Sequence, residues 1–118
     1  MKNFKKLKIW QKGMELVEQT YQLAGQLPKE EKYELRSQVT RAVVSIPSNI
    51  AEGSAKRSKK EYVRYLEIAL GSSYELETQV LIIANLDYGK KELRESILTG
   101  IDEEQKMIQS FIIAVEGS

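Results

Sequence analysis

The segment from residue 37 to residue 53, SQVTRAVVSIPSNIAEG, constrains the fold of this chain more than any other. Apolar residues recur every three or four positions, and a polar line follows beside them at the same spacing, so both lines lie on one side of a helix. The apolar line starts just before the segment and comprises Leu35, Val39, Ala42, Val43, Ile46 and Ile50. The polar line comprises Gln38, Arg41, Ser45, Asn49 and Glu52.

Pro47 stands inside this helical pattern. Proline removes one backbone hydrogen bond and clashes with the carbonyl of Val43, so it predicts either a kink in one helix or a break between two helices. The apolar spacing keeps its phase from Ile46 to Ile50, which favours the kink. We therefore expect one kinked helix over residues 29–55.

Helical spacing also appears before and after this helix, with short breaks between the segments. No strand-like alternation competes with it. Four amphipathic helices with short turns predict an all-α, antiparallel up-down-up-down four-helix bundle, in a single domain spanning residues 1–118. The other three helices are expected over residues 6–26, 59–86 and 90–115.

Two local features mark the third predicted helix. Ser58 and Glu61 have the spacing of a capping box, in which each side chain accepts from the other residue's backbone amide. Gly71 lies at mid-helix, where glycine costs about 1 kcal/mol relative to alanine. We therefore expect another backbone to pack closely against Gly71.

The composition narrows the classes of function. The chain has 118 residues with 42% hydrophobic and 30% charged side chains, which is typical of a folded, soluble domain. It contains no cysteine and no histidine, so it lacks thiol nucleophiles, the commonest metal ligand and the commonest general base. We expect no enzyme activity, no cofactor and no metal site.

No apolar run is long enough to span a membrane, and the lysine-rich N-terminus lacks the apolar core of a signal peptide. We therefore expect a cytoplasmic protein without membrane contact.

Several phrases resemble one family, the bacterial four-helix bundle proteins encoded in intervening sequences of 23S ribosomal RNA genes. These phrases lie at residues 4–12 (FKKLKIWQK), 45–53 (SIPSNIAEG) and 69–79 (ALGSSYELETQ), together with Ser37, Gln38, Arg41 and Ala42. The resemblance covers nearly the whole chain, and the phrase at residues 45–53 is the most specific. It implies a four-helix bundle that assembles into a ring-shaped homo-oligomer, a pentamer, with no established enzymatic activity.

The chain is also similar to the accessory protein of diversity-generating retroelements. That relative forms a basic pentameric barrel that binds nucleic acid and a reverse transcriptase. The helices also carry apolar and aromatic residues outside the single seam that each needs for the core. Because exposed apolar patches usually mark interfaces, this surplus favours an oligomer larger than a dimer. The candidates for this second face are Tyr65, Ile68, Tyr74, Ile82 and Ile112.

The polar line on the second helix has two interpretations, a ligand site or an interhelical polar network that fixes the packing of one helix on the next. The second is favoured, because buried polar groups usually specify packing. A matching line on the third helix includes Arg64 and Glu75. A turn centred near Lys56 places the second and third helices antiparallel in one register, which predicts two ion pairs, Arg41 with Glu75 and Glu52 with Arg64.

Half of the 18 lysine and arginine residues are expected at one end of the bundle, where the first helix starts and the second turns into the third. This end is either a phosphate-binding surface or a solvated pole, and the sequence favours neither. The candidate nucleic-acid contacts are Lys5, Lys6, Lys8, Lys56, Arg57, Lys59 and Lys60. Lys2 and Lys12 belong to the same cluster.

Two functions therefore stay open, a non-enzymatic oligomer that binds RNA or DNA, and a structural or protein-interaction module without nucleic acid. Trp10 offers a stacking surface for bases, but an aromatic residue on an apolar stripe is more often part of the core.

Overall fold

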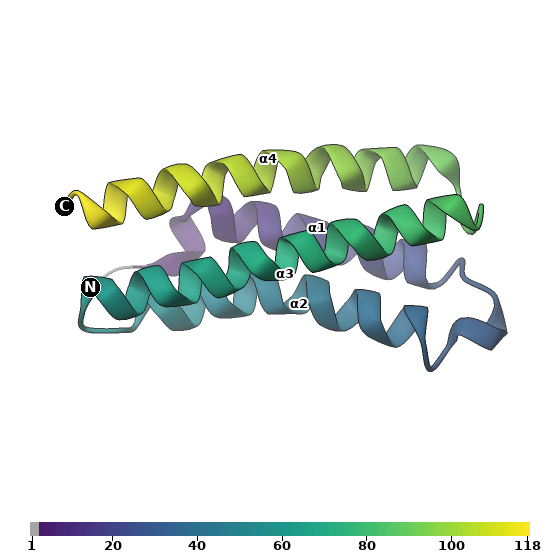
Figure 1. Ribbon diagram of the computed structural model, residues 1–118, viewed down its shortest axis with the longest axis horizontal. Helices are drawn as coiled ribbons and strands as arrows, with labels where there is room; N and C mark the ends of the chain where they lie inside the picture. Colours follow the sequence, from purple (N-terminus) through teal and green to yellow (C-terminus); the bar gives the residue numbers. More distant parts are fainter. Residues whose placement is uncertain (1–2) are drawn as a thin grey trace.

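The computed structural model describes residues 3–118, and four long helices form its framework (Figure 1). No strand occurs among these residues. The helices run alternately in opposite directions in a molecule of 45 × 23 × 20 Å, so the predicted antiparallel bundle is confirmed. The helices are α1 (Lys8–Ala24), α2 (Leu35–Ser54), α3 (Lys59–Asn85) and α4 (Lys91–Glu116), with 3-10 helices η1 (Phe4–Lys6) and η2 (Lys29–Glu31).

The start of α2 differs from the prediction. We expected the helix to begin at residue 29, but it begins at Leu35. The residues between are occupied by η2 and by Glu34, whose φ of −109° and ψ of −97° lie outside the helical region. The helix then continues through the buried Pro47 to Ser54, so the prediction of one helix and not two is confirmed.

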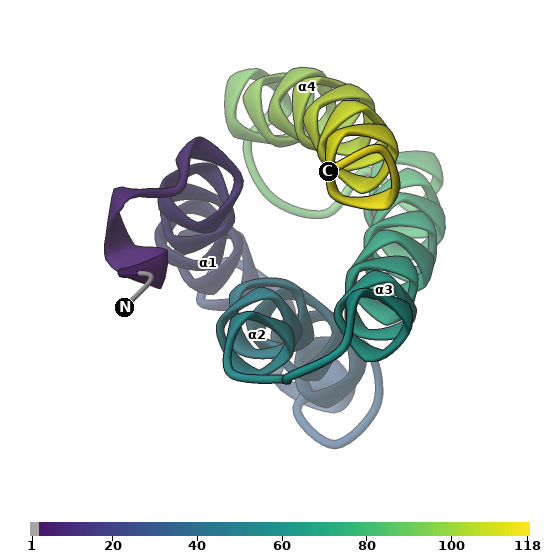
Figure 2. The same cartoon turned by 90° about the vertical axis from the view of Figure 1, so that its left-hand side faces the viewer.

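The core is a shared apolar interior that all four helices surround (Figure 2). In sequence order each helix packs on the next, and α4 returns to α1. The seam positions of the amphipathic patterns are fully buried, which confirms the apolar faces predicted from spacing. They include Leu16, Leu23, Val39, Ile46, Ile50, Leu66, Leu76, Ile83, Ile97, Ile101 and Ile108.

Two glycines have opposite surroundings. A Cβ on the buried Gly100 of α4 would stand 2.9 Å from the Leu16 side chain, so glycine lets α4 approach α1 closely. A Cβ on the exposed Gly71 would meet no atom within 4 Å. The expectation of a closely packed backbone at Gly71 is therefore wrong within the described residues of this chain.

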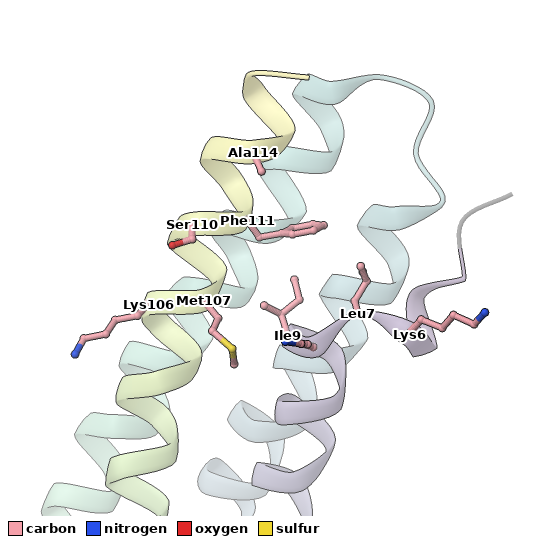
Figure 3. Close-up of a pocket in the computed structure, with 9 residues that line it drawn as sticks. Lys6, Leu7, Ile9, Lys106, Met107, Ser110, Phe111 and Ala114 are labelled. Atoms are coloured by element: carbon pink, nitrogen blue, oxygen red, sulfur yellow. The ribbon is translucent and has the colours of Figure 1, made fainter.

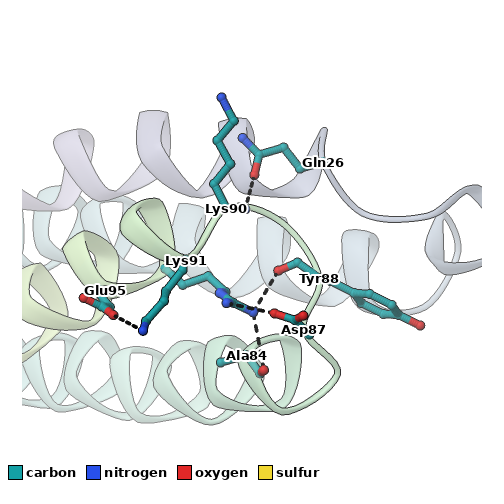
Figure 4. A network of polar contacts seen from close by, with 8 residues as sticks. Gln26, Ala84, Asp87, Tyr88, Lys90, Lys91 and Glu95 are labelled. Carbon is teal, nitrogen blue, oxygen red and sulfur yellow. Dashed lines mark hydrogen bonds and ion pairs between the residues drawn. The ribbon is translucent and has the colours of Figure 1, made fainter.

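A buried arginine closes the turn between α3 and α4. Arg94 is 6% exposed and donates to the carbonyls of Ala84 at 3.3 Å and Tyr88 at 3.2 Å. Its second terminal nitrogen lies 3.2 Å from an Asp87 carboxylate oxygen. Figure 4 shows this network beside the hydrogen bond from the Lys90 amide to Gln26, at 2.8 Å. Arg94 thus ties the last turn of α3, at Ala84, to the loop that follows it, at Asp87 and Tyr88.

Candidate nucleic-acid interface

The start of α1 and the turn between α2 and α3 lie at one end of the bundle (Figure 1). η1 contacts α2 there, and the C-terminus of α4 ends nearby. The sequence-predicted clustering of basic residues is therefore present in the fold. We call this end the basic pole and define it by Lys5, Lys6, Lys8, Lys56, Arg57, Lys59 and Lys60. Lys2 lies outside the described residues.

Six of the seven side chains of the basic pole are exposed, and only Lys56 is half-buried. The Lys56 ammonium lies 5.0 Å from the centroid of the Tyr65 ring, in a cation–π contact. None of the seven forms an ion pair with a described residue. Their charges are therefore available to a ligand in solution.

A helix cap positions the lysines of the basic pole that lie at the start of α3. The Glu61 amide donates to the Ser58 hydroxyl oxygen at 3.1 Å, which caps the N-terminus of α3 and confirms that half of the capping box. The Ser58 hydroxyl also lies 3.4 Å from a Glu61 carboxylate oxygen. The cap fixes the direction in which Lys59 and Lys60 leave the turn.

Lys12 does not belong to the basic pole. Its ammonium lies 3.0 Å from a Glu103 carboxylate oxygen and 3.7 Å from one of Glu15. The bond to Glu103 is the main cause that raises the pKa of Lys12 above its usual value. Because this ammonium is already neutralised within the bundle, it has little charge left for a phosphate.

Acidic residues border the α3 side of the pole. A groove of about 620 Å³ there is lined by Lys59, Lys60 and Arg64, and also by Glu61, Glu67 and Glu116. Its charges are mixed, so it favours a polyanion less than the exposed lysines beside it do.

A second groove, of about 530 Å³, lies between the start of α1 and the C-terminal half of α4 (Figure 3). We call it the α1–α4 groove. Its floor is apolar, and lysines from η1, α1 and α4 stand at its edge. The apolar lining comprises Leu7, Ile9, Met107, Phe111 and Ala114.

Of the residues predicted to form a polar network between α2 and α3, only Ser45 makes a contact from one helix to the other among the described residues. The hydroxyl oxygens of Ser45 and Ser72 lie 2.8 Å apart. The Asn49 amide donates to the Ser45 carbonyl at 2.8 Å and to its hydroxyl at 2.9 Å. The contacts run between helices and within α2, which supports the packing interpretation over a ligand site.

Neither of the two predicted ion pairs forms among the described residues, and all four of their members are exposed at the surface. Arg41 donates to the Ser37 hydroxyl at 3.1 Å, and Glu75 accepts from Gln79 at 3.4 Å. Gln38, Glu52 and Arg64 are exposed as well and form no ion pair with a described residue. The predicted register was nevertheless close, since the Ser45–Ser72 contact differs from it by one residue.

The most unusual polar group is one that the sequence analysis missed. Glu104 is fully buried, and neither carboxylate oxygen has a hydrogen-bond partner among the described residues. Burial raises its pKa to about 8, although the nearby Lys12 charge lowers it. The sequence does carry a signal for this burial. Arg94 and Glu104 fall at the same three-and-four spacing as Ile97, Ile101 and Ile108, so all five lie on the seam of α4.

The aromatic residues divide between core and surface. Trp10 packs against the core and makes an edge-to-face contact with Phe4, with ring centroids 5.4 Å apart, which favours its structural role. Tyr74 is exposed, and its hydroxyl accepts from Gln109 at 3.2 Å. Tyr65 is half-buried under Lys56.

Within residues 3–118 no helix is both long and apolar enough to cross a membrane. The same residues contain no group of three acidic, cysteine or histidine side chains placed to hold a metal ion.

Comparisons with known proteins agree with this architecture. A crystal structure from Bacteroides thetaiotaomicron VPI-5482, of a protein with unknown function from the S23 ribosomal protein family, has a similar fold with a TM-score of 0.81. The two sequences are 28% identical, over 88% of this chain and 97% of that one. No curated protein matches this chain.

Residues 5–110 match the family model described as 23S rRNA-intervening sequence protein. This match includes every helix of the bundle except the last turns of α4. It also confirms the family suggested by the three sequence phrases. The chain therefore belongs to the 23S rRNA-intervening sequence protein family.

Proposed function

We propose that this protein is a non-enzymatic homo-oligomer that binds the phosphate backbone of RNA or DNA through its basic pole. The observation that carries the proposal is the gathering of seven basic side chains at one end of the bundle, without ion pairs to described residues. Phosphate contacts from lysine and arginine supply affinity that does not depend on sequence. The resemblance of the sequence to the accessory protein of diversity-generating retroelements implies the same function.

The chemistry of the pole defines the kind of binding. Six of its seven basic residues are lysines, which are flexible point charges with little capacity to recognise base edges. Contacts of this kind position a nucleic acid and do not specify its sequence. We therefore expect binding that depends weakly on sequence and strongly on salt concentration.

The outer side of α3 supports the homo-oligomer. One exposed stripe contains Ile68, Gly71 and Ile82 at helical spacing, with Ile68 and Ile82 41% and 42% exposed. Apolar side chains beside an open glycine suit the close approach of another helix. We propose that a second copy packs there, within the pentameric ring that the resemblance implies, and that the ring repeats the basic pole around its axis.

Two measurements test this function. Light scattering at micromolar concentration should show an assembly larger than a dimer, and a stable monomer would contradict the oligomer. Binding of labelled RNA should be detectable at low salt and should fall steeply as salt rises, because released counterions drive phosphate binding. An intact oligomer that binds neither RNA nor DNA at low salt would contradict nucleic-acid binding.

The second candidate is a structural or protein-interaction module in the cytoplasm. The observation that favours it is the mixed charge beside the pole, where Glu61, Glu67 and Glu116 lie among the basic residues. The net charge of +1 also gives the whole chain little attraction for a polyanion. The binding measurement at low salt separates the two candidates.

A further inference from the structure

The α1–α4 groove combines two properties that the rest of the basic pole lacks. Its floor is formed by apolar side chains, and its edges carry lysines from three elements, η1, α1 and α4. Figure 3 shows the Lys6 and Lys106 side chains extending away from opposite sides of the groove. Lys6 and Lys8 are exposed and form no ion pair with residues 3–118, and Lys106 forms a surface pair with Asp102 at 3.0 Å. Such a surface pair contributes little and opens readily.

This arrangement selects among anionic ligands with an apolar part. A fatty acid carries one charge at one end, so it would leave the cations on the other side of the groove without a partner. A nucleotide within a strand carries a phosphate on each side of its base. Lys56, Lys59 and Lys60 lie at the same end of the bundle, where α2 turns into α3, and offer further cations to a repeating anion.

We propose that the α1–α4 groove receives an unpaired base of single-stranded RNA or DNA, while Lys6, Lys8 and Lys106 contact the flanking phosphates. This inference rests on the proposed function and adds the class of ligand, a single strand in place of a duplex. Bases of every kind stack on aromatic side chains, so a groove of this type is tolerant of sequence.

Phe111 supplies the aromatic surface of the groove. Its ring makes an edge-to-face contact with Tyr62, with centroids 5.9 Å apart and an interplanar angle of 71°. That contact restrains the ring before a ligand arrives. Ser110 also lines the groove, and Figure 3 shows its hydroxyl on the outer side of α4, away from the apolar floor.

The test compares three labelled ligands at low salt by fluorescence anisotropy: a short oligothymidylate, a duplex of the same length, and an abasic sugar-phosphate oligomer. The single strand should bind more tightly than the abasic oligomer, by roughly five- to a hundredfold for each stacked base. Equal affinities for these two ligands would overturn the groove proposal and leave phosphate binding intact. Absence of binding to all three would overturn the proposed function itself.

Two variants locate the effect. Ala114→Leu fills the groove from an exposed position on α4, and Thr99→Leu is its control on another exposed part of that helix. Phe111→Leu keeps an apolar side chain but removes the ring, and its thermal unfolding is measured in parallel because Phe111 contacts Tyr62. Ala114→Leu and Phe111→Leu should lose the preference for the single strand over the abasic oligomer, while Thr99→Leu keeps it. An unchanged preference in Ala114→Leu would overturn the proposal.

Discussion

A carboxylate oxygen of Glu104 on α4 stands 3.3 Å from the position that a Cβ on Gly13 of α1 would occupy. Two atoms of the Pro47 ring on α2 lie equally close to that position. The absence of a side chain at Gly13 therefore makes room for an acidic group at the meeting point of three helices. Burial keeps that group protonated at neutral pH, because its pKa is raised to about 8.

The first prediction is a pH dependence of stability caused by Glu104. The folded protein holds this proton up to about pH 8, whereas the unfolded chain releases it near the usual value of 4.5. The unfolded chain binds fewer protons between these values, so the free energy of unfolding falls as pH rises through this window, by up to about 1.4 kcal/mol per pH unit.

Glu104→Gln removes this titration and keeps the shape of the side chain. Relative to the parent, the variant should gain stability as pH rises through the same window, by a few kcal/mol in total. Urea unfolding of both proteins below pH 4.5 and above about pH 8 measures the difference. The comparison cancels other groups, including Tyr62, whose pKa burial also raises. Parallel stability curves would show that Glu104 does not titrate abnormally.

The hydroxyl contact between α2 and α3 gives the second prediction. Ser45→Ala leaves the Ser72 hydroxyl without its interhelical partner and should lower the free energy of unfolding by about 1 kcal/mol. Ser72→Ala should cost a similar amount, and the double variant should cost less than the sum. Ser48→Ala, at an exposed position one residue past Pro47, is the control. Additive losses in urea unfolding would show that the two hydroxyls do not interact.

Arg94 gives the third prediction. Arg94→Met removes the donor to the carbonyls of Ala84 in α3 and Tyr88 in the following turn, and should cost about 2 to 3 kcal/mol. Lys91→Met changes an exposed residue on the first turn of α4, whose pair with Glu95 is a surface contact, and should cost less than about 1 kcal/mol. Chemical unfolding of the two variants tests the difference. Equal small losses would mean that the buried guanidinium contributes no net stability.

Gly71 gives the fourth prediction, on the oligomer. Alanine at this exposed position should stabilise α3 of an isolated chain by up to about 1 kcal/mol, because nothing obstructs its Cβ. In the proposed assembly the same methyl group would enter an interface between copies. Gly71→Ala should therefore weaken the assembly in light scattering while α3 gains stability. If the variant and the parent lose mass equally on dilution, or neither does, the interface lies elsewhere.

A second variant tests the same exposed stripe of α3 and leaves Gly71 unchanged. Ile68→Ser replaces an exposed apolar residue of the α3 stripe, and Ile113→Ser does the same on α4, where Ile113 is 70% exposed. Only the first should lower the mass of the assembly. Equal effects of both variants would contradict an interface on α3.

The sequence predicts most of the fold because its apolar residues repeat with helical spacing, and short turns leave little choice of topology. It misplaces the start of α2, since the irregular backbone at Glu34 has no strong signal in residues 29–34. It also predicts an interhelical ion pair between Arg41 and Glu75, whereas the structure leaves both side chains at the surface, each bonded within its own helix. Residue spacing predicts the register of α2 against α3 to within one residue. It does not predict whether a long side chain beside the seam turns toward the neighbouring helix or toward solvent.

The candidate site is predictable in part for the same reason. Antiparallel topology brings Lys5, Lys6 and Lys8 to the end that also holds Lys59 and Lys60. The α1–α4 groove is not predictable, because it depends on how far apart the ends of two helices lie. The buried Glu104 could have been recognised, since it stands between Ile101 and Ile108 on the seam of α4.

The most direct test of the basic pole is the salt dependence of RNA binding in two charge-matched variants. The first changes Lys56, Arg57, Lys59 and Lys60 to glutamine, and the second changes the same number of exposed lysines at the opposite end, Lys29, Lys32, Lys90 and Lys91. The pole variant should bind more weakly, with a slope of log affinity against log salt reduced by about 0.7 to 0.9 per lost phosphate contact. The opposite-end variant should keep the parent slope. A pole variant with an unchanged slope, or equal losses in both variants, would contradict binding at the basic pole.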